Sequence, residues 1–183
     1  MNRKRSASKG KKINPHFWVF CEGATEEAYV CFLRSRYRIP AEIVTKISGS
    51  KISEGEIKKY KQGKPQHEKD IDFLIYDADV QDTLIRLRSI CAVTLITSNP
   101  SIELWFLIHY KTQTAHISTS ECIKELRNRN RNNYRKGILD ERLRARLAGH
   151  YSEACKRAEK LTLYENPSSN MFLIIEAMEE AKK

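Results

Sequence analysis

An apolar run, His16-Phe17-Trp18-Val19-Phe20-Cys21, breaks off at Glu22-Gly23. A second run of the same kind, Ile71-Asp72-Phe73-Leu74-Ile75-Tyr76, breaks off at Asp77-Ala78-Asp79. Short runs rich in aromatic and β-branched residues are typical of buried strands in a parallel sheet. In open α/β sheets, functional groups collect outside the carboxyl ends of the strands. If the two strands are neighbours, their acidic clusters therefore meet at one edge of the sheet.

The rest of the chain alternates between strand and helix patterns. This order predicts an α/β sandwich with a mostly parallel, four-stranded sheet flanked by helices, and a helical C-terminal third. Further strands are expected at 42–47 and 92–97, and helices at 26–37, 56–61, 80–89, 102–110, within 118–163 and at 171–183. The expected divisions are a disordered basic arm (1–14), an α/β core (15–112) and a helical extension packed on that core (113–183).

Three carboxylates, Glu22, Asp77 and Asp79, follow the first and third strands. Carboxylates that converge repel one another unless a cation neutralises them. Hard oxygen ligands of this kind suit Mg²⁺, with Mn²⁺ as a substitute. The pattern therefore predicts a divalent-metal site. The alternative is that Asp77-Ala78-Asp79 caps the helix that follows, a position that Asp favours.

The segment Ser98-Asn99-Pro100-Ser101 has the features of a helix start, with Asn99 and Ser101 as expected caps. The helix after it is apolar almost all round, which is typical of a helix buried on both sides. Glu103 lies in its first turn, where an unpaired buried carboxylate is costly. We expect either a metal or a buried Arg or Lys beside Glu103.

The net charge of +10 is concentrated in two segments. The first 12 residues carry six Lys or Arg and no acid, and residues 124–160 carry 12 basic and five acidic side chains. Such a distribution indicates contact with a polyanion, and nucleic acid is the expected partner. A well-solvated surface is the alternative explanation.

Within the second basic segment, residues 127–136 combine cations, amides and Tyr134. These side-chain types contact phosphates and stack on bases. We expect DNA or RNA to bind here, with an affinity that falls with added salt. The candidate nucleic-acid-binding residues are Arg127, Arg129, Arg131, Arg135 and Lys136.

Length and composition bound the class of protein. A chain of 183 residues fits one domain with a small helical appendage. No stretch approaches the roughly 18 apolar residues of a membrane span, and the basic N-terminus has no apolar segment behind it. We therefore expect no membrane association and a cytoplasmic location. The five cysteines form no C-x-x-C pair, so no structural zinc site is expected.

Three segments taken together resemble the RloB-like proteins, a Toprim-related family encoded beside phage-resistance and restriction genes. The segments are Cys21–Glu26, Ser98–Trp105 and Asn166–Asn170, and the resemblance runs from residue 17 to about residue 178. The order of Glu22-Gly23 and Asp77-x-Asp79 after their strands is also similar to the Toprim domain of topoisomerases, bacterial primases and OLD-family nucleases.

The resemblance implies a compact Toprim-like fold, a metal-dependent nuclease and an ATPase partner subunit. The residues that match the acidic positions of the motifs are Glu22, Glu26, Asp77, Asp79 and Glu103. One position departs from the pattern, because Val80 stands where a further acid is expected and Asp82 follows two residues later. Asp82 accordingly joins Glu22, Asp77 and Asp79 as a candidate metal ligand.

The function expected from the sequence is Mg²⁺- or Mn²⁺-dependent hydrolysis of DNA or RNA in bacterial antiphage or abortive-infection defence. The main alternative is a non-catalytic sensor or effector subunit whose acidic pocket binds a metal or a nucleotide. A Toprim nucleotidyl transferase is a third option, but the chain has no primase-like zinc element. Assembly into a homo-oligomer is compatible with each of these functions.

Overall fold

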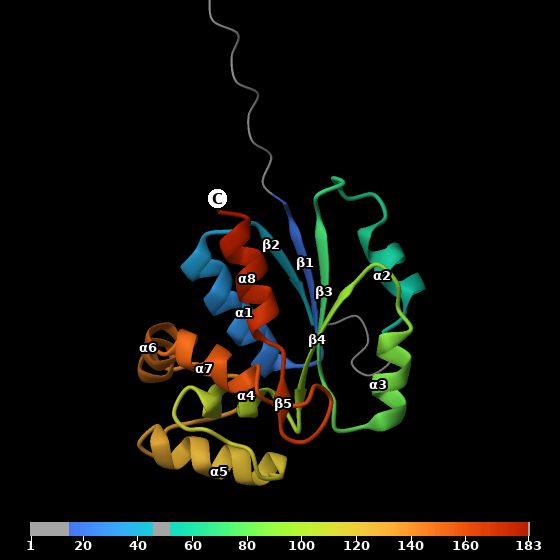
Figure 1. Cartoon of the computed structure of the whole chain (residues 1–183). Coiled ribbons are helices and arrows are strands. Elements are labelled where there is room, and N and C mark those ends of the chain that lie inside the picture. The colour runs from blue at the N-terminus through green and yellow to red at the C-terminus, as the bar shows by residue number, and fades with distance from the viewer. Residues whose placement is uncertain (1–14, 46–51, 183) are drawn as a thin grey trace, which may run out of the picture.

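A single sheet with helices on both faces forms the body of the protein (Figure 1). The computed structural model describes residues 15–45 and 52–182, so the predicted arm at 1–14 lies outside the described residues. Within them the strand order is β2-β1-β3-β4-β5. The strands are β1 (Phe17–Cys21), β2 (Ala41–Val44), β3 (Ile71–Asp77), β4 (Thr94–Asn99) and β5 (Ser168–Ser169). The first four are parallel and β5 is antiparallel to β4, which confirms the predicted α/β class.

Alternate side chains of the strands point to two separate cores. Phe17 and Val19 of β1 belong to a large apolar cluster on one face, whereas Trp18 and Phe20 belong to a smaller cluster on the other. Because side chains of a strand alternate between faces, a run that is apolar at every position needs cover on both sides. The uninterrupted run at 16–21 is thus explained by burial on both faces.

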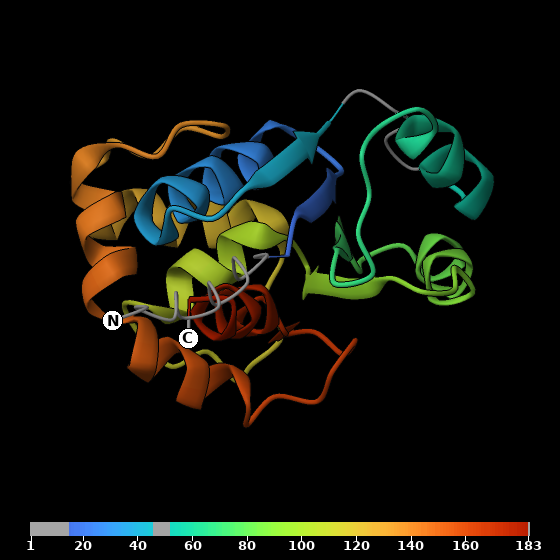
Figure 2. The same cartoon turned by 90° about the horizontal axis from the view of Figure 1, so that it is seen from above.

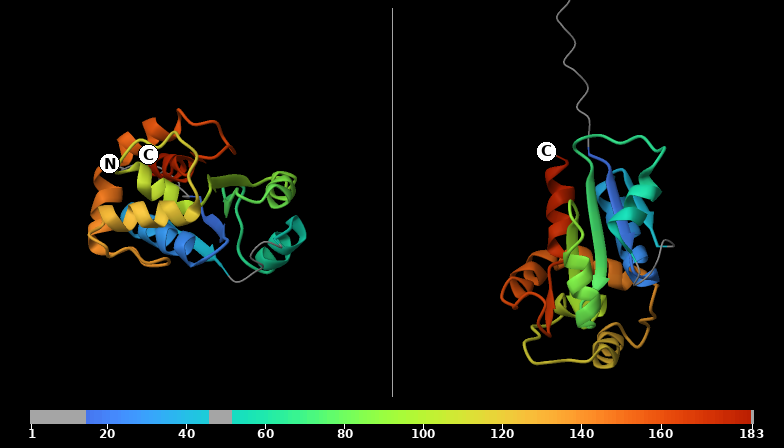
Figure 3. Two further views of the ribbon diagram at one scale, coloured as in Figure 1. Left: turned by 90° about the horizontal axis from the view of Figure 1, so that it is seen from below. Right: turned by 90° about the vertical axis from the view of Figure 1, so that its right-hand side faces the viewer.

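Helices supply that cover unequally. On the face of the smaller cluster lie α2 (Glu54–Lys61) and α3 (Gln81–Arg88), which Figure 2 shows from above on one side of the sheet. The larger cluster includes buried side chains from all the remaining helices. These are α1 (Ala24–Tyr37), α4 (Ile102–Ile108), α5 (Thr119–Arg129), α6 (Glu141–Gly149), α7 (Tyr151–Ala158) and α8 (Phe172–Glu180). The right-hand view of Figure 3 shows α5 at the lower end of the molecule, and α5 contacts α4.

The C-terminal third of the chain contributes a strand to the sheet as well as helices. The helix expected at 171–183 is α8, but just before it Ser168 and Ser169 pair with Asn99 and Ser98 of β4. The next residue, Asn170, extends this pairing with its side chain: Oδ1 accepts from the Thr97 N–H at 2.6 Å and Nδ2 donates to the Leu95 carbonyl at 3.0 Å. A strand of two serines has no apolar alternation, so the sequence pattern does not reveal it.

The same pairing moves the boundary of β4. The strand was expected at 92–97, but it spans Thr94–Asn99, because Ser98 and Asn99 bind β5 instead of starting the next helix. Ala92 has a φ of 58° and lies before the strand rather than within it. The predicted end of β2 at residues 46–47 lies outside the described residues.

Every residue of α4 is buried, as its all-round apolar pattern predicts. Its last carbonyl groups therefore need partners from the protein. Two arginines supply them: Arg146 Nε donates to the His109 carbonyl at 2.9 Å, and Arg157 Nη1 donates to the Ile108 carbonyl at 2.5 Å. Among the described residues, none of the helices has both the length and the apolar character needed to cross a membrane.

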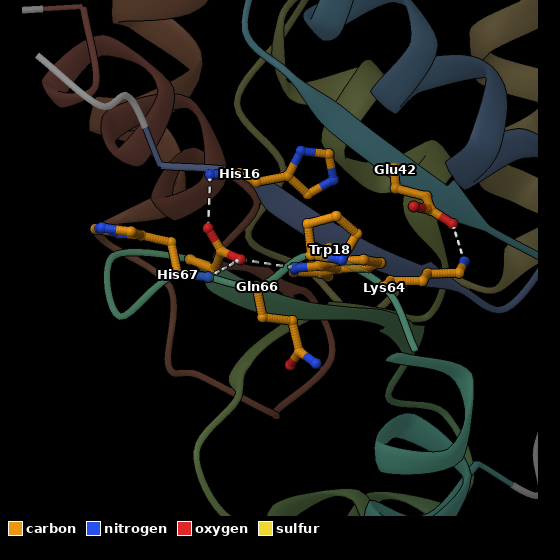
Figure 4. Close-up of a pocket in the computed structure, with 8 residues that line it drawn as sticks. His16, Trp18, Glu42, Lys64, Gln66 and His67 are labelled. Atoms are coloured by element: carbon orange, nitrogen blue, oxygen red, sulfur yellow. Dashed lines mark hydrogen bonds and ion pairs between the residues drawn. The ribbon is translucent and has the colours of Figure 1, made fainter. Parts of the chain in front are cut away.

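A cavity of about 410 Å³ lies at the amino ends of the strands (Figure 4). Asp70 accepts hydrogen bonds there from the backbone N–H groups of His16 and His67 and from Trp18 Nε1, at 3.1, 3.0 and 3.3 Å. These bonds hold the connection before β3 against the sheet. The cavity is lined by His16, Trp18, Glu42, Lys64, Pro65, Gln66, His67 and Asp70.

Candidate metal centre

The two acidic clusters meet at the carboxyl ends of β1 and β3. These strands are parallel neighbours with Cys21 opposite Ile75, which fulfils the condition under which the clusters were expected to meet. Glu22 Oε2 accepts a hydrogen bond from the Asp77 N–H at 2.9 Å, so its side chain reaches across to the end of β3. Figure 1 shows the carboxyl ends of β1 and β3 at the lower end of the sheet, whereas the cavity of Figure 4 is lined by residues at the amino ends of the strands.

Two further carboxylates come from helix starts. Glu26 lies in the first turn of α1 and is 6% exposed, and Glu103 lies in the first turn of α4 and is fully buried. All four line one cavity of about 300 Å³, which we call the acidic pocket. Its lining consists of Glu22, Gly23, Ala24, Thr25, Glu26, Asp77, Glu103, Lys136 and Gly137.

Asp79 and Asp82 do not line the acidic pocket, and both are exposed. The alternative that Asp77 and Asp79 cap the following helix does not hold, since α3 begins after Val80 without a side-chain cap. Asp77 instead binds a different helix, because its Oδ1 accepts the Ile102 N–H of α4 at 3.1 Å. Asp77 and Asp79 therefore lie in different environments, the first in the acidic pocket and the second at the surface.

Burial and mutual repulsion shift the proton equilibria of the pocket. The pKa of Glu26 rises to about 7 because its carboxylate is buried and lies near Glu103 and Glu22. The pKa of Asp77 rises to about 9, chiefly through burial and then through the charges of Glu26, Glu22 and Glu103. A site whose acids bind protons this readily also favours a cation in their place.

The donor set fits a hard divalent cation, since it consists of carboxylate oxygens around one small cavity. Among the described residues, however, no three His, Cys, Asp or Glu side chains are already gathered into a group that could hold a metal ion. The pocket therefore has the ligand chemistry for Mg²⁺ without a preformed coordination cage.

In the acidic pocket, Glu103 has three side-chain partners. Ser101 Oγ donates to its Oε2 and Tyr134 Oη donates to its Oε1, both at 2.7 Å. Lys136 Nζ lies 3.8 Å from the same Oε1. Ser101 thus occupies the cap position of α4, as expected, but its hydroxyl binds Glu103 instead of the helix backbone. The other expected cap, Asn99, donates to the carbonyls of Ala78 and Tyr164.

In the basic segment at 127–136, some arginines bind other protein groups and others are exposed to solvent. Arg127 Nε donates to the Tyr134 carbonyl at 3.2 Å, and Arg129 Nε lies 3.7 Å from Glu125. Arg131 and Arg135 are exposed and form no salt bridge within the described residues. Lys136 belongs to the acidic pocket itself.

Sequence reasoning missed the roles of Tyr134, Ser101 and Thr25. Tyr134 was interpreted as an aromatic that stacks on bases, but it is 2% exposed and therefore closed to a base. Thr25 Oγ1 accepts the Gly137 N–H at 3.0 Å and so ties the basic segment to the start of α1. The spacing Ser101-x-Glu103 was visible in the sequence, whereas the partner of Tyr134 lies 31 residues away.

Comparisons with known proteins place the chain in a family. The C-terminal region of the Burkholderia pseudomallei OLD protein is similar in structure, with 15% sequence identity, 93% of this chain and 98% of that chain covered, and a TM-score of 0.39. At this TM-score the likeness supports no conclusion about function. Among curated proteins, none matches the chain. The family model described as "RloB-like protein" matches residues 17–178, and the chain therefore belongs to the RloB-like family.

Proposed function

We propose that this protein is a divalent-metal-dependent nuclease that hydrolyses phosphodiester bonds in DNA or RNA. The observation that carries the proposal is the acidic pocket, where four carboxylates and one lysine line a single cavity at the carboxyl ends of two parallel strands. The raised pKa values of Glu26 and Asp77 support it, because they arise from burial and from the repulsion between neighbouring carboxylates, which a bound cation would relieve.

Glu22 and Asp77 would hold the ion in this proposal, with Glu26 and Glu103 assisting. A bound Mg²⁺ would supply charge neutralisation at the phosphate and an activated water. Lys136, which is 56% exposed, can reach a phosphate at the mouth of the pocket. Glu22 is half-buried and retains access to solvent, so it is the proposed acceptor of a proton from water. Asp79 and Asp82 are exposed and would join only after a local rearrangement.

Arg131 and Arg135 add two further cations to the basic segment that contains Lys136. Because their side chains are exposed, they are available to contact the phosphates of a bound strand. The proposed substrate path therefore leads along the surface of the basic segment into the acidic pocket. Membership of the RloB-like family supports the further proposal of a role in antiphage defence with an ATPase partner.

The test is cleavage of labelled single-stranded and double-stranded DNA and RNA by the purified chain with Mg²⁺, with Mn²⁺ and with EDTA. We expect cleavage only with a metal, and a loss of at least about 100-fold in Glu22→Gln and Asp77→Asn, above the roughly 10–100-fold cost of losing an outer-shell partner. Glu68→Gln is the control, because Glu68 is exposed and lies in the connection at the opposite end of the sheet. Circular dichroism establishes that each variant is folded. Full activity in both pocket variants would contradict the proposal.

One observation favours a second function, a non-catalytic sensor or effector subunit, over catalysis by the isolated chain. Among the described residues the acids are not yet arranged as a metal-binding group. A subunit of this kind would bind a metal or a nucleotide in the acidic pocket and leave the reaction to its partner. Binding of Mn²⁺ without cleavage of any of the four substrates by the isolated chain would select this function.

A further inference from the structure

The hydroxyl group of Tyr134 joins two parts of the molecule that have different proposed tasks. It donates to Glu103 Oε1 inside the acidic pocket, while its own backbone belongs to the basic segment. Burial and the neighbouring Glu103 raise the pKa of Tyr134, so the hydroxyl stays protonated and remains a donor. Since Tyr134 is 2% exposed, this hydrogen bond is shielded from water.

The residues around Tyr134 hold the basic segment in one position. Arg127 Nε binds the Tyr134 carbonyl, and Asn130 Nδ2 donates to Asp140 at 2.8 Å across the base of the loop. On the other side, the Gly137 N–H binds Thr25 of α1. Gly137 has a φ of 75°, and a Cβ there would lie 3.3 Å from the Cβ of Ala24. The loop is thus seated closely against the helix that carries Glu26.

Lys136 and a metal ion would compete for the same carboxylate oxygen. Lys136 Nζ lies 3.8 Å from Glu103 Oε1, the atom that also accepts the Tyr134 hydrogen bond. A cation bound at this oxygen would repel the ammonium group and release it toward the mouth of the pocket. There the freed charge would meet a phosphate, so that the ion and the nucleic acid assist each other.

We infer that Tyr134 is a positioning residue that couples metal binding in the acidic pocket to nucleic-acid binding by the basic segment. The inference rests on the proposed function, because it takes both ligands from it. The hydroxyl holds Glu103 Oε1, the oxygen beside Lys136, in place, so that a cation bound at this oxygen displaces Lys136 toward the nucleic acid. Coupling of this kind is reciprocal: if Mn²⁺ tightens nucleic-acid binding, nucleic acid tightens Mn²⁺ binding by the same factor.

The test measures two affinities in three proteins: the wild type, Tyr134→Phe and Tyr29→Phe. The affinity for a cleavage-resistant phosphorothioate oligonucleotide is measured by fluorescence anisotropy with Mn²⁺ and with EDTA, and Mn²⁺ affinity by electron paramagnetic resonance. In the wild type we expect Mn²⁺ to tighten oligonucleotide binding about fivefold or more. In Tyr134→Phe the factor should fall below about 2, and Mn²⁺ affinity should drop about tenfold, as for other outer-shell partners of metal ligands.

Tyr29→Phe is a matched control, since Tyr29 is 1% exposed and its hydroxyl accepts from Trp105 Nε1 at 2.7 Å, away from the pocket. In Tyr29→Phe, Mn²⁺ should tighten oligonucleotide binding by the same factor as in the wild type. Lys136→Met provides a second, exposed variant that does not depend on core packing. It should bind Mn²⁺ more tightly, because a competing charge is gone, yet bind the oligonucleotide more weakly. Tyr134→Phe, in contrast, should weaken the binding of both Mn²⁺ and the oligonucleotide.

Two results would overturn the inference: a wild type whose oligonucleotide affinity is the same with Mn²⁺ and EDTA, or a Tyr134→Phe protein that keeps the wild-type factor. The cleavage assay decides the proposed function separately. If the chain cleaves nucleic acid but Mn²⁺ does not change its oligonucleotide affinity, the proposed function stands and the inference about Tyr134 is wrong. If Mn²⁺ tightens oligonucleotide binding but the chain cleaves nothing, the inference stands and the proposed nuclease function is wrong.

Discussion

Glu26 and Asp77 illustrate how the surroundings of a carboxylate change its pKa. Both lie among other acids at the carboxyl ends of strands, and burial is the first cause of their raised pKa values of about 7 and about 9. In the unfolded chain these groups titrate near 4.5 and 3.8. The folded protein therefore binds more protons than the unfolded chain between these limits, and its free energy of unfolding must depend on pH.

The sign of this dependence is a prediction for the metal-free protein. Without a divalent ion, the contribution of both groups to stability is fully present below about pH 4 and is lost as the pH rises through about 7 and about 9. Calorimetry in EDTA should show Tm falling from about pH 5 to about pH 9, with about 2–4 °C for each kcal/mol in a domain of this size. Glu26→Gln should reduce the slope below about pH 7, because Glu26 loses its proton in the folded protein over that range.

Glu68→Gln is the control for this measurement, since Glu68 is exposed at the other end of the molecule. Its Tm should follow the wild-type curve over the whole pH range. A Glu26→Gln protein whose curve runs parallel to that of the wild type would show that Glu26 does not contribute. Saturating Mn²⁺ should flatten the wild-type slope, because the ion replaces the protons.

At the scale of the elements, β5 is extended by the side chain of a single residue, Asn170. It has only two residues, and the sheet continues beyond it through the amide of Asn170, which binds Thr97 and Leu95 of β4. Ser98 and Ser169 add a buried hydroxyl pair at 2.9 Å. A backbone N–H or carbonyl group that loses its partner when buried costs about 1–3 kcal/mol.

Asn170→Ala should therefore lower the free energy of unfolding by about 2–4 kcal/mol, since it leaves the Thr97 N–H and the Leu95 carbonyl without their partner. Urea denaturation measures this loss. Asn128→Ala is the comparison, because Asn128 is exposed on α5, and such surface changes stay within about 0.5 kcal/mol. Equal stability of the two variants would show that β5 is held by other contacts.

At the scale of the whole molecule, a negatively charged region and a positively charged region are neighbours. The acidic pocket lies at the carboxyl ends of the strands, and the basic segment borders it through Lys136. The cavity at the amino ends contains the paired groups Glu42 and Lys64. A polyanion would therefore be drawn to the end of the molecule that holds the acidic pocket, where the cations of the basic segment offset the acids.

This arrangement predicts the salt dependence of binding. Arg131 and Arg135 are exposed, so replacing both with Met should lower the slope of log affinity against log salt concentration by about 1.4–1.8, close to one phosphate contact each. Fluorescence anisotropy between 50 and 200 mM salt, about the range in which such slopes are measured, gives the value. Lys69→Met, at the opposite end before β3, should leave the slope unchanged. An unchanged slope in the double variant would place the nucleic acid elsewhere.

The sequence by itself determined the mostly parallel sheet and the buried α4. Both follow from local patterns, because apolar runs identify strands and an all-round apolar helix must be buried. That β1 and β3 are neighbours, which brings Glu22 to Asp77, was a condition that the structure fulfils. Whether the acids bind a metal stays a prediction. Only the tertiary structure revealed β5, the exposure of Asp79, and the hydrogen bond from Tyr134 to Glu103. These depend on contacts between residues that are distant in the chain, such as Ser98 and Ser169, and such contacts leave no periodic pattern in the sequence.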